Sequence, residues 1–141
     1  MLEITRCKPK GMEDPVVTGG RARSRKEAFR SAFAGWWHVL RTQRNAWVHA
    51  LATLAVCALG LWLQLSSIEW AILWLAIGLV WTAEFVNTAL EAVVDLASPD
   101  LHPLARVGKD VGAAAVLIAA GIAVIIGLLI LGPPLLSQWL P

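Results

Sequence analysis

The pattern of hydrophobic and polar positions along the chain predicts three membrane-spanning helices. Residues 46–65 form the first apolar run and contain no Asp, Glu, Lys or Arg. About 20 such residues are enough to cross a hydrocarbon core roughly 30 Å thick. A second run covers 70–97 and a third covers 103–131, where Pro103 suits the first turn of a helix. The third helix is expected to end at Gly132, Pro133 and Pro134.

An amphipathic helix is predicted over residues 24–44, before the first span. Ser24 and Glu27 fit a capping box, in which the two residues satisfy exposed amides at the start of a helix. This pattern is typical of a helix on the surface of an anionic leaflet. The alternative, a core-facing helix of a soluble domain, is disfavoured by the three apolar runs that follow. Apolar side chains recur at helical spacing with basic ones around them: Phe29, Phe33, Trp36, Trp37 and Leu40, and Arg25, Lys26, Arg30, Arg41 and Arg44.

The segments outside the predicted helices complete the domain plan. Residues 1–23 are rich in Lys, Arg, Pro and Gly and lack an apolar run, so they are predicted to be a flexible tail. Between the first two spans, Ser66 and Glu69 fit a second capping box. Residues 24–141 are therefore expected to form one integral membrane domain.

Composition and charge support this plan and suggest an orientation. The chain is 57% hydrophobic and 16% charged, whereas about a quarter of the residues in a soluble domain are charged. The net charge of +2 gives no reason to expect nucleic-acid binding. Cys7 and Cys57 are expected to be free thiols. The positive-inside rule places the surface helix and the start of the third span in the cytoplasm and the C-terminus outside, because basic side chains gather at Arg41, Arg44, Arg106 and Lys109.

The inner half of the second predicted span carries a polar stripe. At about 100° per residue, Glu84, Asn87, Glu91 and Asp95 fall within an arc of roughly 80°. An acid at the centre of a membrane helix costs on the order of 2.5–3.5 kcal/mol. Such residues face a cavity or a partner helix and by default mark a working site. Glu84 is expected to lie deepest and to carry most of this cost.

The stripe suggests magnesium-assisted phosphate chemistry at the membrane surface. Mg²⁺ favours one or two carboxylates together with substrate phosphates, and a carboxylate can also act as a general base. Lys109 and Asp110 begin the third helix at a similar depth, and phosphoryl transfer depends mainly on positioning and charge neutralisation. Two alternatives remain open at this point. In the first, Glu91 and Asp95 simply pair with Arg106 and Lys109; in the second, Glu84 serves a small oligomeric proton- or cation-coupled transporter.

The same residues carry a family resemblance. The motif EFVNTALEAVVD, followed by SPDLHPLARVGKDVGAAAVLIA, resembles the prokaryotic diacylglycerol kinase and undecaprenol kinase family of small membrane enzymes. The likeness runs from about residue 25 to 131. It implies a homotrimer in the bacterial inner membrane, with three spans and a surface helix in each protomer. It also implies active sites between protomers, where the γ-phosphate of ATP passes to a lipid hydroxyl at the cytoplasmic face.

The resemblance implies roles for individual residues of the stripe. Glu84 matches the catalytic base of the family, and Glu91 matches a ligand of Mg²⁺. Asn87 matches a residue that assists in the nucleotide and metal site. At the place where the family often has a second metal-binding glutamate, this chain has Gln43. An amide oxygen ligates Mg²⁺ more weakly than a carboxylate, so Gln43 is expected to be a weaker metal or nucleotide contact.

The remaining matches concern the nucleotide and the lipid. Lys109 and Asp110 match a pair that contacts the ATP phosphates and orders the site. Asp95 matches a structural or nucleotide-side acid, and His102 matches a residue near the nucleotide. The segments SPDLHPLA and TQRNAWVH are more similar to the undecaprenol kinase branch of the family. Undecaprenol is therefore the favoured substrate, with diacylglycerol close behind.

Overall fold

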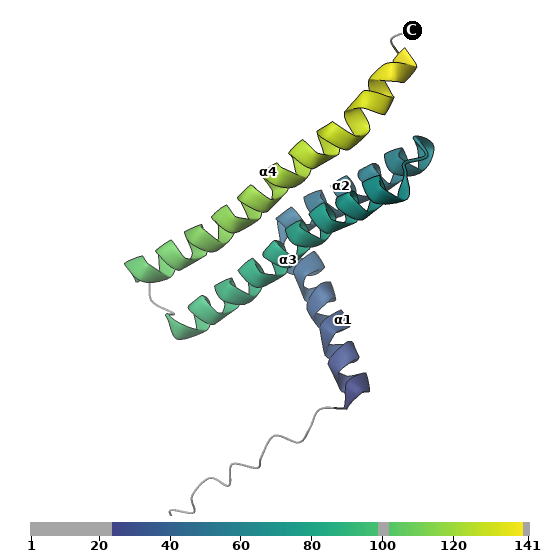
Figure 1. Cartoon of the computed structure of the whole chain (residues 1–141). Helices are drawn as coiled ribbons and strands as arrows, with labels where there is room; N and C mark the ends of the chain where they lie inside the picture. Colours follow the sequence, from purple (N-terminus) through teal and green to yellow (C-terminus); the bar gives the residue numbers. More distant parts are fainter. Residues whose placement is uncertain (1–23, 99–101, 140–141) are drawn as a thin grey trace, which may run out of the picture. The chain divides into compact units, whose positions relative to one another are not determined.

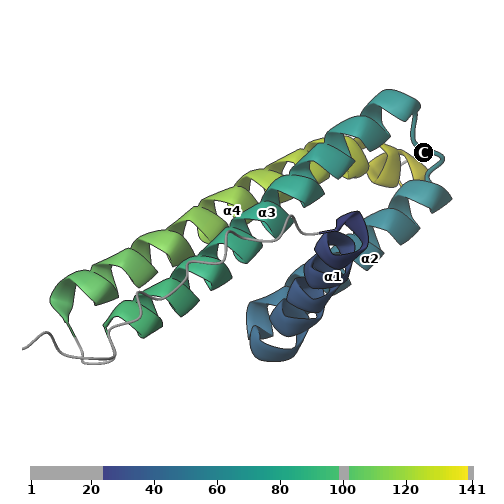
Figure 2. The ribbon, with the colours of Figure 1, turned by 90° about the horizontal axis from the view of Figure 1, so that it is seen from below.

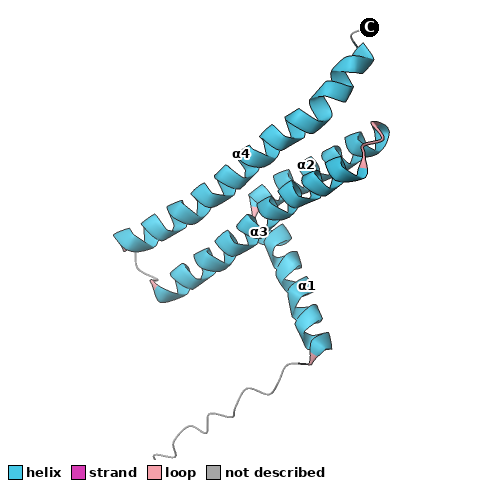
Figure 3. Ribbon diagram, in the orientation of Figure 1, coloured by secondary structure: helices cyan, strands magenta, loops and turns pink. Residues whose placement is uncertain are grey.

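The computed structural model describes residues 24–98 and 102–139, and these residues form four α-helices joined by short segments (Figure 3). The helices are α1 (Arg25–Thr42), α2 (Arg44–Trp62), α3 (Ser67–Ala97) and α4 (Pro103–Trp139). The expectation of an all-helical chain is confirmed for this part of the sequence. The predicted tail over 1–23, with Cys7, lies outside the described residues.

The chain divides into two compact units, Met1–Ala34 and Gly35–Pro141. In the described part of the first unit, the backbone N–H of Ser24 donates to the Glu27 carboxylate, and the N–H of Glu27 donates to Ser24 Oγ. This is the predicted capping box at the start of α1. The second unit contains the last turns of α1 and all of α2, α3 and α4.

Within the second unit, α3 packs most extensively against α4, and the two run side by side in Figures 1 and 2. Three helices are long and apolar enough to cross a membrane, namely α2, α3 and the part of α4 up to Gln138. Many of their large apolar side chains are exposed, among them Leu51, Leu54, Leu75, Leu117 and Leu129. Exposed apolar surface on this scale marks contact with a membrane or with another protein.

The turn between α2 and α3 is built by two helix caps. At the end of α2, the N–H of Leu65 donates to the carbonyl of Gly60, and the N–H of Gln64 donates to the carbonyl of Leu61. This is a Schellman motif, and Gln64 takes the left-handed conformation it requires, with φ of 53°. The helix therefore ends three residues before the predicted limit of 65. Ser66 and Glu69 then form the predicted capping box, and α3 starts at Ser67 rather than at 70.

The end of α4 differs from the prediction. Pro133 and Pro134 lie inside the helix, which continues to Trp139, so the expectation that they end it is wrong. The φ of proline is fixed near a helical value, but a proline inside a helix donates no backbone hydrogen bond and its ring crowds the carbonyl four residues back. The residue before Pro133 is Gly132, which has no Cβ to add a further clash. Ser137 Oγ also donates to the carbonyl of Pro134 at 3.0 Å, which supports the last turn.

A small aromatic core joins the last turns of α1 to α2 and α3. Val39, Ala46 and Trp81 are its buried members. Trp36 stacks on Trp81, with ring centroids 4.8 Å apart. These contacts hold the break between α1 and α2, at Gln43, against the middle of α3. The core therefore positions Gln43 beside the predicted polar stripe.

Candidate active site

Glu84 is the most deeply buried polar residue of the stripe, with 1% of its side chain exposed. Its Oε2 lies 3.8 Å from Nε2 of His49 in α2. Within the part of the chain that the structure describes, neither atom has a hydrogen-bond partner. Buried polar atoms without partners are rare in folded proteins, and those that occur are often functional. Glu84 is therefore a candidate for a functional role, because its Oε2 is buried and accepts no hydrogen bond from the described residues.

Glu91, two turns further along α3, is held by two amides. Asn87 Nδ2 donates to Glu91 Oε1 at 3.0 Å. Gln43 Nε2 donates to Glu91 Oε2 at 3.2 Å. Gln43 is also the N-cap residue of α2, but its side chain makes no capping bond there. Its side chain instead spans to α3, so the structure brings Gln43 to the residue with which it was expected to act.

α3 and α4 approach each other closely beside Asn87. A Cβ added to Gly112 would collide with Asn87 Oδ1 and crowd Leu90, so glycine is required at this approach. Asn87 Oδ1 is buried and has no hydrogen-bond partner among the described residues. The Asn87 side chain therefore donates an N–H to Glu91, while its Oδ1 can still accept a hydrogen bond or bind a cation.

The end of α3 and the start of α4 line an open cavity of about 880 Å³ that carries several charged side chains. Lys109 Nζ lies 2.5 Å from Asp95 Oδ1, so the simple ion pairing considered for Asp95 is present. Both side chains are substantially exposed, at 38% and 66%, and exposed pairs of this kind contribute little to stability. The charged and polar lining consists of Asp95, Ser98, His102, Arg106, Lys109 and Asp110.

His102 lines this cavity and accepts hydrogen bonds from the first turn of α4. Its Nδ1 accepts a hydrogen bond from the N–H of Leu104 at 3.2 Å, and its carbonyl accepts from Ala105 and Arg106. These bonds satisfy donors that the first turn of a helix leaves free. The structure thus gathers four of the seven residues expected in the nucleotide site around one cavity: Asp95, His102, Lys109 and Asp110. The other three, Gln43, Asn87 and Glu91, do not line it.

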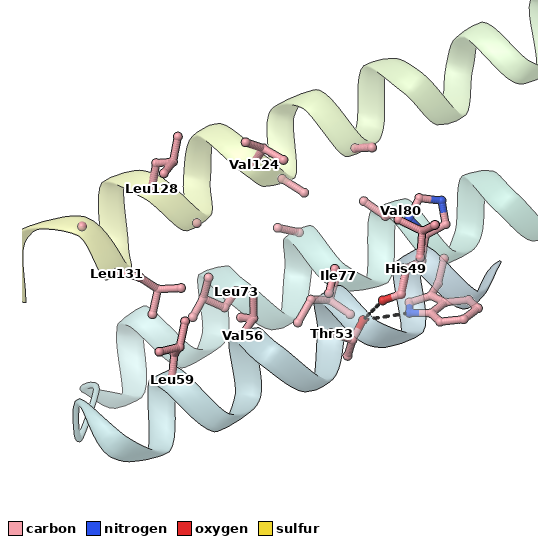
Figure 4. A pocket seen from close by; sticks show the side chains of 18 of the residues that line it. His49, Thr53, Val56, Leu59, Leu73, Ile77, Val80, Val124, Leu128 and Leu131 are labelled. Carbon is pink, nitrogen blue, oxygen red and sulfur yellow. Dashed lines mark hydrogen bonds between the residues drawn. The ribbon is translucent and has the colours of Figure 1, made fainter. Parts of the chain in front are cut away.

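A second cavity, of about 440 Å³, is almost entirely apolar and lies between α2, α3 and α4. Figure 4 shows His49 and Val80 at one end of it and Leu59, Leu128 and Leu131 toward the other. Thr53 accepts a hydrogen bond from Trp81 Nε1 at 3.3 Å and donates to the carbonyl of His49 at 2.7 Å.

Sequence reasoning missed His49, because a single histidine in an apolar run gives no sign of which acid it will face. Its pairing with Glu84 depends on how α2 packs on α3.

These observations define a class of protein: a helical membrane protein with a polar site along one helix long enough to span the membrane. The site runs from the buried carboxylate of Glu84 to an open cavity with charged side chains. Comparison with known sequences identifies the family. The profile of the family described as prokaryotic diacylglycerol kinase matches residues 30–131. The chain belongs to this family.

Relatives of known name agree with this assignment. The chain is 46% identical over 109 residues to undecaprenol kinase of Bacillus subtilis (strain 168), an alignment that covers 77% of this chain and 89% of that protein. It is 46% identical over 111 residues to diacylglycerol kinase of Synechocystis sp., covering 78% of this chain and 63% of that protein. The diacylglycerol kinase of Escherichia coli (strain K12) is 37% identical over 89 residues, an alignment that covers 58% of this chain and 73% of that protein. The chain is therefore a lipid kinase, and nothing in the comparisons supports a transporter.

Proposed function

We propose that this lipid kinase transfers the γ-phosphate of ATP to the primary hydroxyl of undecaprenol, with diacylglycerol as a second substrate. The buried carboxylate of Glu84, whose Oε2 accepts no hydrogen bond from the described residues, is the observation that carries this proposal. The choice of undecaprenol is supported by the Bacillus subtilis relative, because the alignment covers 89% of that protein. The 46% identity to a diacylglycerol kinase supports the second substrate.

Glu84 serves as the general base in this proposal. The lipid hydroxyl gives its proton to the Glu84 carboxylate while its oxygen attacks the γ-phosphorus of ATP, and ADP leaves with the bridging oxygen. Glu84 is suited to this role because it is 1% exposed, so water competes poorly for it. Lys109 neutralises the phosphate charge after it separates from Asp95. Asp110 and His102 line the same cavity and contribute to nucleotide binding.

The residues around Glu91 fit a magnesium site. Mg²⁺ prefers oxygen ligands and commonly takes one or two carboxylates plus phosphates and water. Glu91 supplies the carboxylate, and Gln43 and Asn87 can turn their amide oxygens toward the ion. Asn87 Oδ1 is buried and accepts no hydrogen bond within residues 24–98 and 102–139. Bound Mg²⁺ would neutralise charge on the transferred phosphate.

We further propose a homotrimer in the bacterial inner membrane with its sites shared between protomers. The surface helix and the open cavity face the cytoplasm, and the C-terminus faces outward. The exposed apolar side chains of α2, α3 and α4 supply surface both for lipid and for neighbouring copies. The basic side chains near the cavity, Arg106 and Lys109, support the cytoplasmic orientation.

Purified protein with labelled ATP and Mg²⁺, offered undecaprenol and diacylglycerol separately, tests the activity and the substrate together. We expect label in both lipids, with the higher kcat/KM for undecaprenol, and none after Mg²⁺ is chelated. A protein that labels neither lipid contradicts the proposed reaction, and a preference for diacylglycerol contradicts the choice of substrate. Light scattering in detergent should give the mass of three chains. Mixing Glu84→Gln with Lys109→Ala protomers, at an ATP concentration at which neither variant alone is active, should restore part of the activity if sites are shared.

A further inference from the structure

His49 is a polar group in a helix that otherwise faces apolar surroundings. It lies in the second turn of α2, and 14% of its side chain is exposed. Its Nε2 points at Glu84 Oε2 across 3.8 Å, and both atoms are buried without a hydrogen-bond partner in the described part of the chain. That distance is too long for a hydrogen bond. Contacts within active sites are often long before substrate binds and close in the reacting complex.

The surroundings of His49 fix the direction of its ring. The ring meets Trp81 edge-on, with centroids 6.3 Å apart and planes 69° apart. One turn later, Thr53 Oγ1 donates to the His49 carbonyl and accepts from Trp81 Nε1, which ties α2 to α3 at this level. Figure 4 shows the histidine at the end of the apolar cavity, with the Thr53 bonds drawn beside it. The Thr53 hydrogen bonds and the contact with Trp81 therefore hold His49 so that its Nε2 faces Glu84.

We propose that His49 is a positioning residue for Glu84. Its Nε2–H closes onto Glu84 Oε2 when the lipid head group enters, and this bond turns Oε1 toward the lipid hydroxyl. The inference rests on the proposed role of Glu84 as the base. The proton of the lipid hydroxyl passes to Glu84 Oε1, the lipid oxygen bonds to the γ-phosphorus, and the bond to the bridging oxygen of ADP breaks. His49 keeps its proton throughout, so it acts only through the placement of Glu84.

Three substitutions test this role, because they differ in where they place a donor. Glutamine carries its amide nitrogen about where histidine carries Nε2, asparagine carries it about where histidine carries Nδ1, and alanine carries none. We expect His49→Ala to lower kcat about 100-fold, the size of effect that misplacing a reacting group by about 1 Å can produce. The KM for ATP should stay within about twofold, because ground-state nucleotide binding does not involve Glu84. His49→Gln should recover most of the lost kcat, and His49→Asn should resemble His49→Ala.

His38→Ala is the matched control, since it removes an exposed histidine of α1. Its kcat should equal that of the wild type. Each variant is first checked for thermal unfolding and oligomeric mass in detergent. Wild-type kcat in His49→Ala would overturn the inference. So would an equal loss in all three His49 variants, which would indicate a packing role, or a loss confined to the KM for ATP. Failure of the proposed function itself is distinguishable, because the wild-type protein would then label no lipid alcohol.

Discussion

Replacing Gln43 with glutamate should make the stability of this protein depend on Mg²⁺. The substitution exchanges the donor of a 3.2 Å hydrogen bond to Glu91 for a second carboxylate. Two unit charges at that separation repel by about 5 kcal/mol at an effective dielectric constant of about 20, and by about 1 kcal/mol in bulk water. Both side chains are part-buried and can rotate apart. We therefore expect Gln43→Glu to lower the free energy of unfolding by about 1–3 kcal/mol when Mg²⁺ is absent.

Added Mg²⁺ should reverse this loss. Two carboxylates hold the ion more strongly than one carboxylate with an amide, and a ligand that binds only the folded state stabilises it. The Mg²⁺ concentration that gives half-maximal kinase activity should fall about tenfold, which corresponds to about 1.4 kcal/mol of binding free energy. Thermal unfolding in detergent, with chelator or with millimolar Mg²⁺, measures the first effect. A titration of kinase activity with Mg²⁺ measures the second.

Gln43→Ala is the control for this prediction. It removes the same hydrogen bond without adding charge, so it should destabilise the protein in chelator but show no rescue by Mg²⁺ beyond that of the wild type. If Gln43→Glu matches the wild type with and without Mg²⁺, Gln43 does not act beside Glu91. If Gln43→Glu needs more Mg²⁺ than the wild type, the ion is held elsewhere.

Three further substitutions test other parts of the site. Glu84→Gln should abolish phosphate transfer while leaving the oligomeric mass in detergent unchanged; full activity would remove Glu84 as the base. Lys109→Ala should raise the KM for ATP at least about tenfold in steady-state assays, because a cation that neutralises phosphate charge is lost, and unchanged kinetics would exclude Lys109 from the nucleotide site. Gly112→Ala should lower the free energy of unfolding by about 1–3 kcal/mol, since its Cβ would strike Asn87. Gly121→Ala, where nothing lies within 4 Å, should not.

The helices could be predicted from sequence because their signals are local. Long apolar runs identified the three helices that can span a membrane. Both capping boxes could be predicted from the sequence, because each needs only two residues three positions apart. The helix ends were harder. The left-handed turn at Gln64 has no sequence signal of the usual kind, because glycine normally takes that conformation. Pro133 and Pro134 lie inside α4, where the general rule on proline would have ended the helix.

The candidate site was predictable where it lies on one helix. Glu84, Asn87 and Glu91 share a face of α3 because helical spacing alone places them there, and the bond between Asn87 and Glu91 follows from that spacing. Contacts between helices required packing information. The bond from Gln43 to Glu91 was expected only through a family resemblance. The approach of His49 to Glu84 was not expected at all, because nothing in a sequence gives the rotation of α2 against α3.

If the proposed function holds, the change in exposure along α3 lets one helix serve a lipid and a water-soluble nucleotide. Glu84 is 1% exposed, whereas the Asp95 side chain, three turns further along the helix, is 66% exposed. Under the proposed function, a lipid hydroxyl must be deprotonated where water is excluded, while ATP must enter and leave through water. A buried base costs stability, and an exposed cation pair costs little. The base lies at the buried end of the helix, and the Asp95–Lys109 pair lies at the open end. Only Glu84 therefore carries the loss of stability that comes from burying a charged group. Glu91, midway between them, is then the position from which a metal ion could reach both the nucleotide and the reacting oxygen.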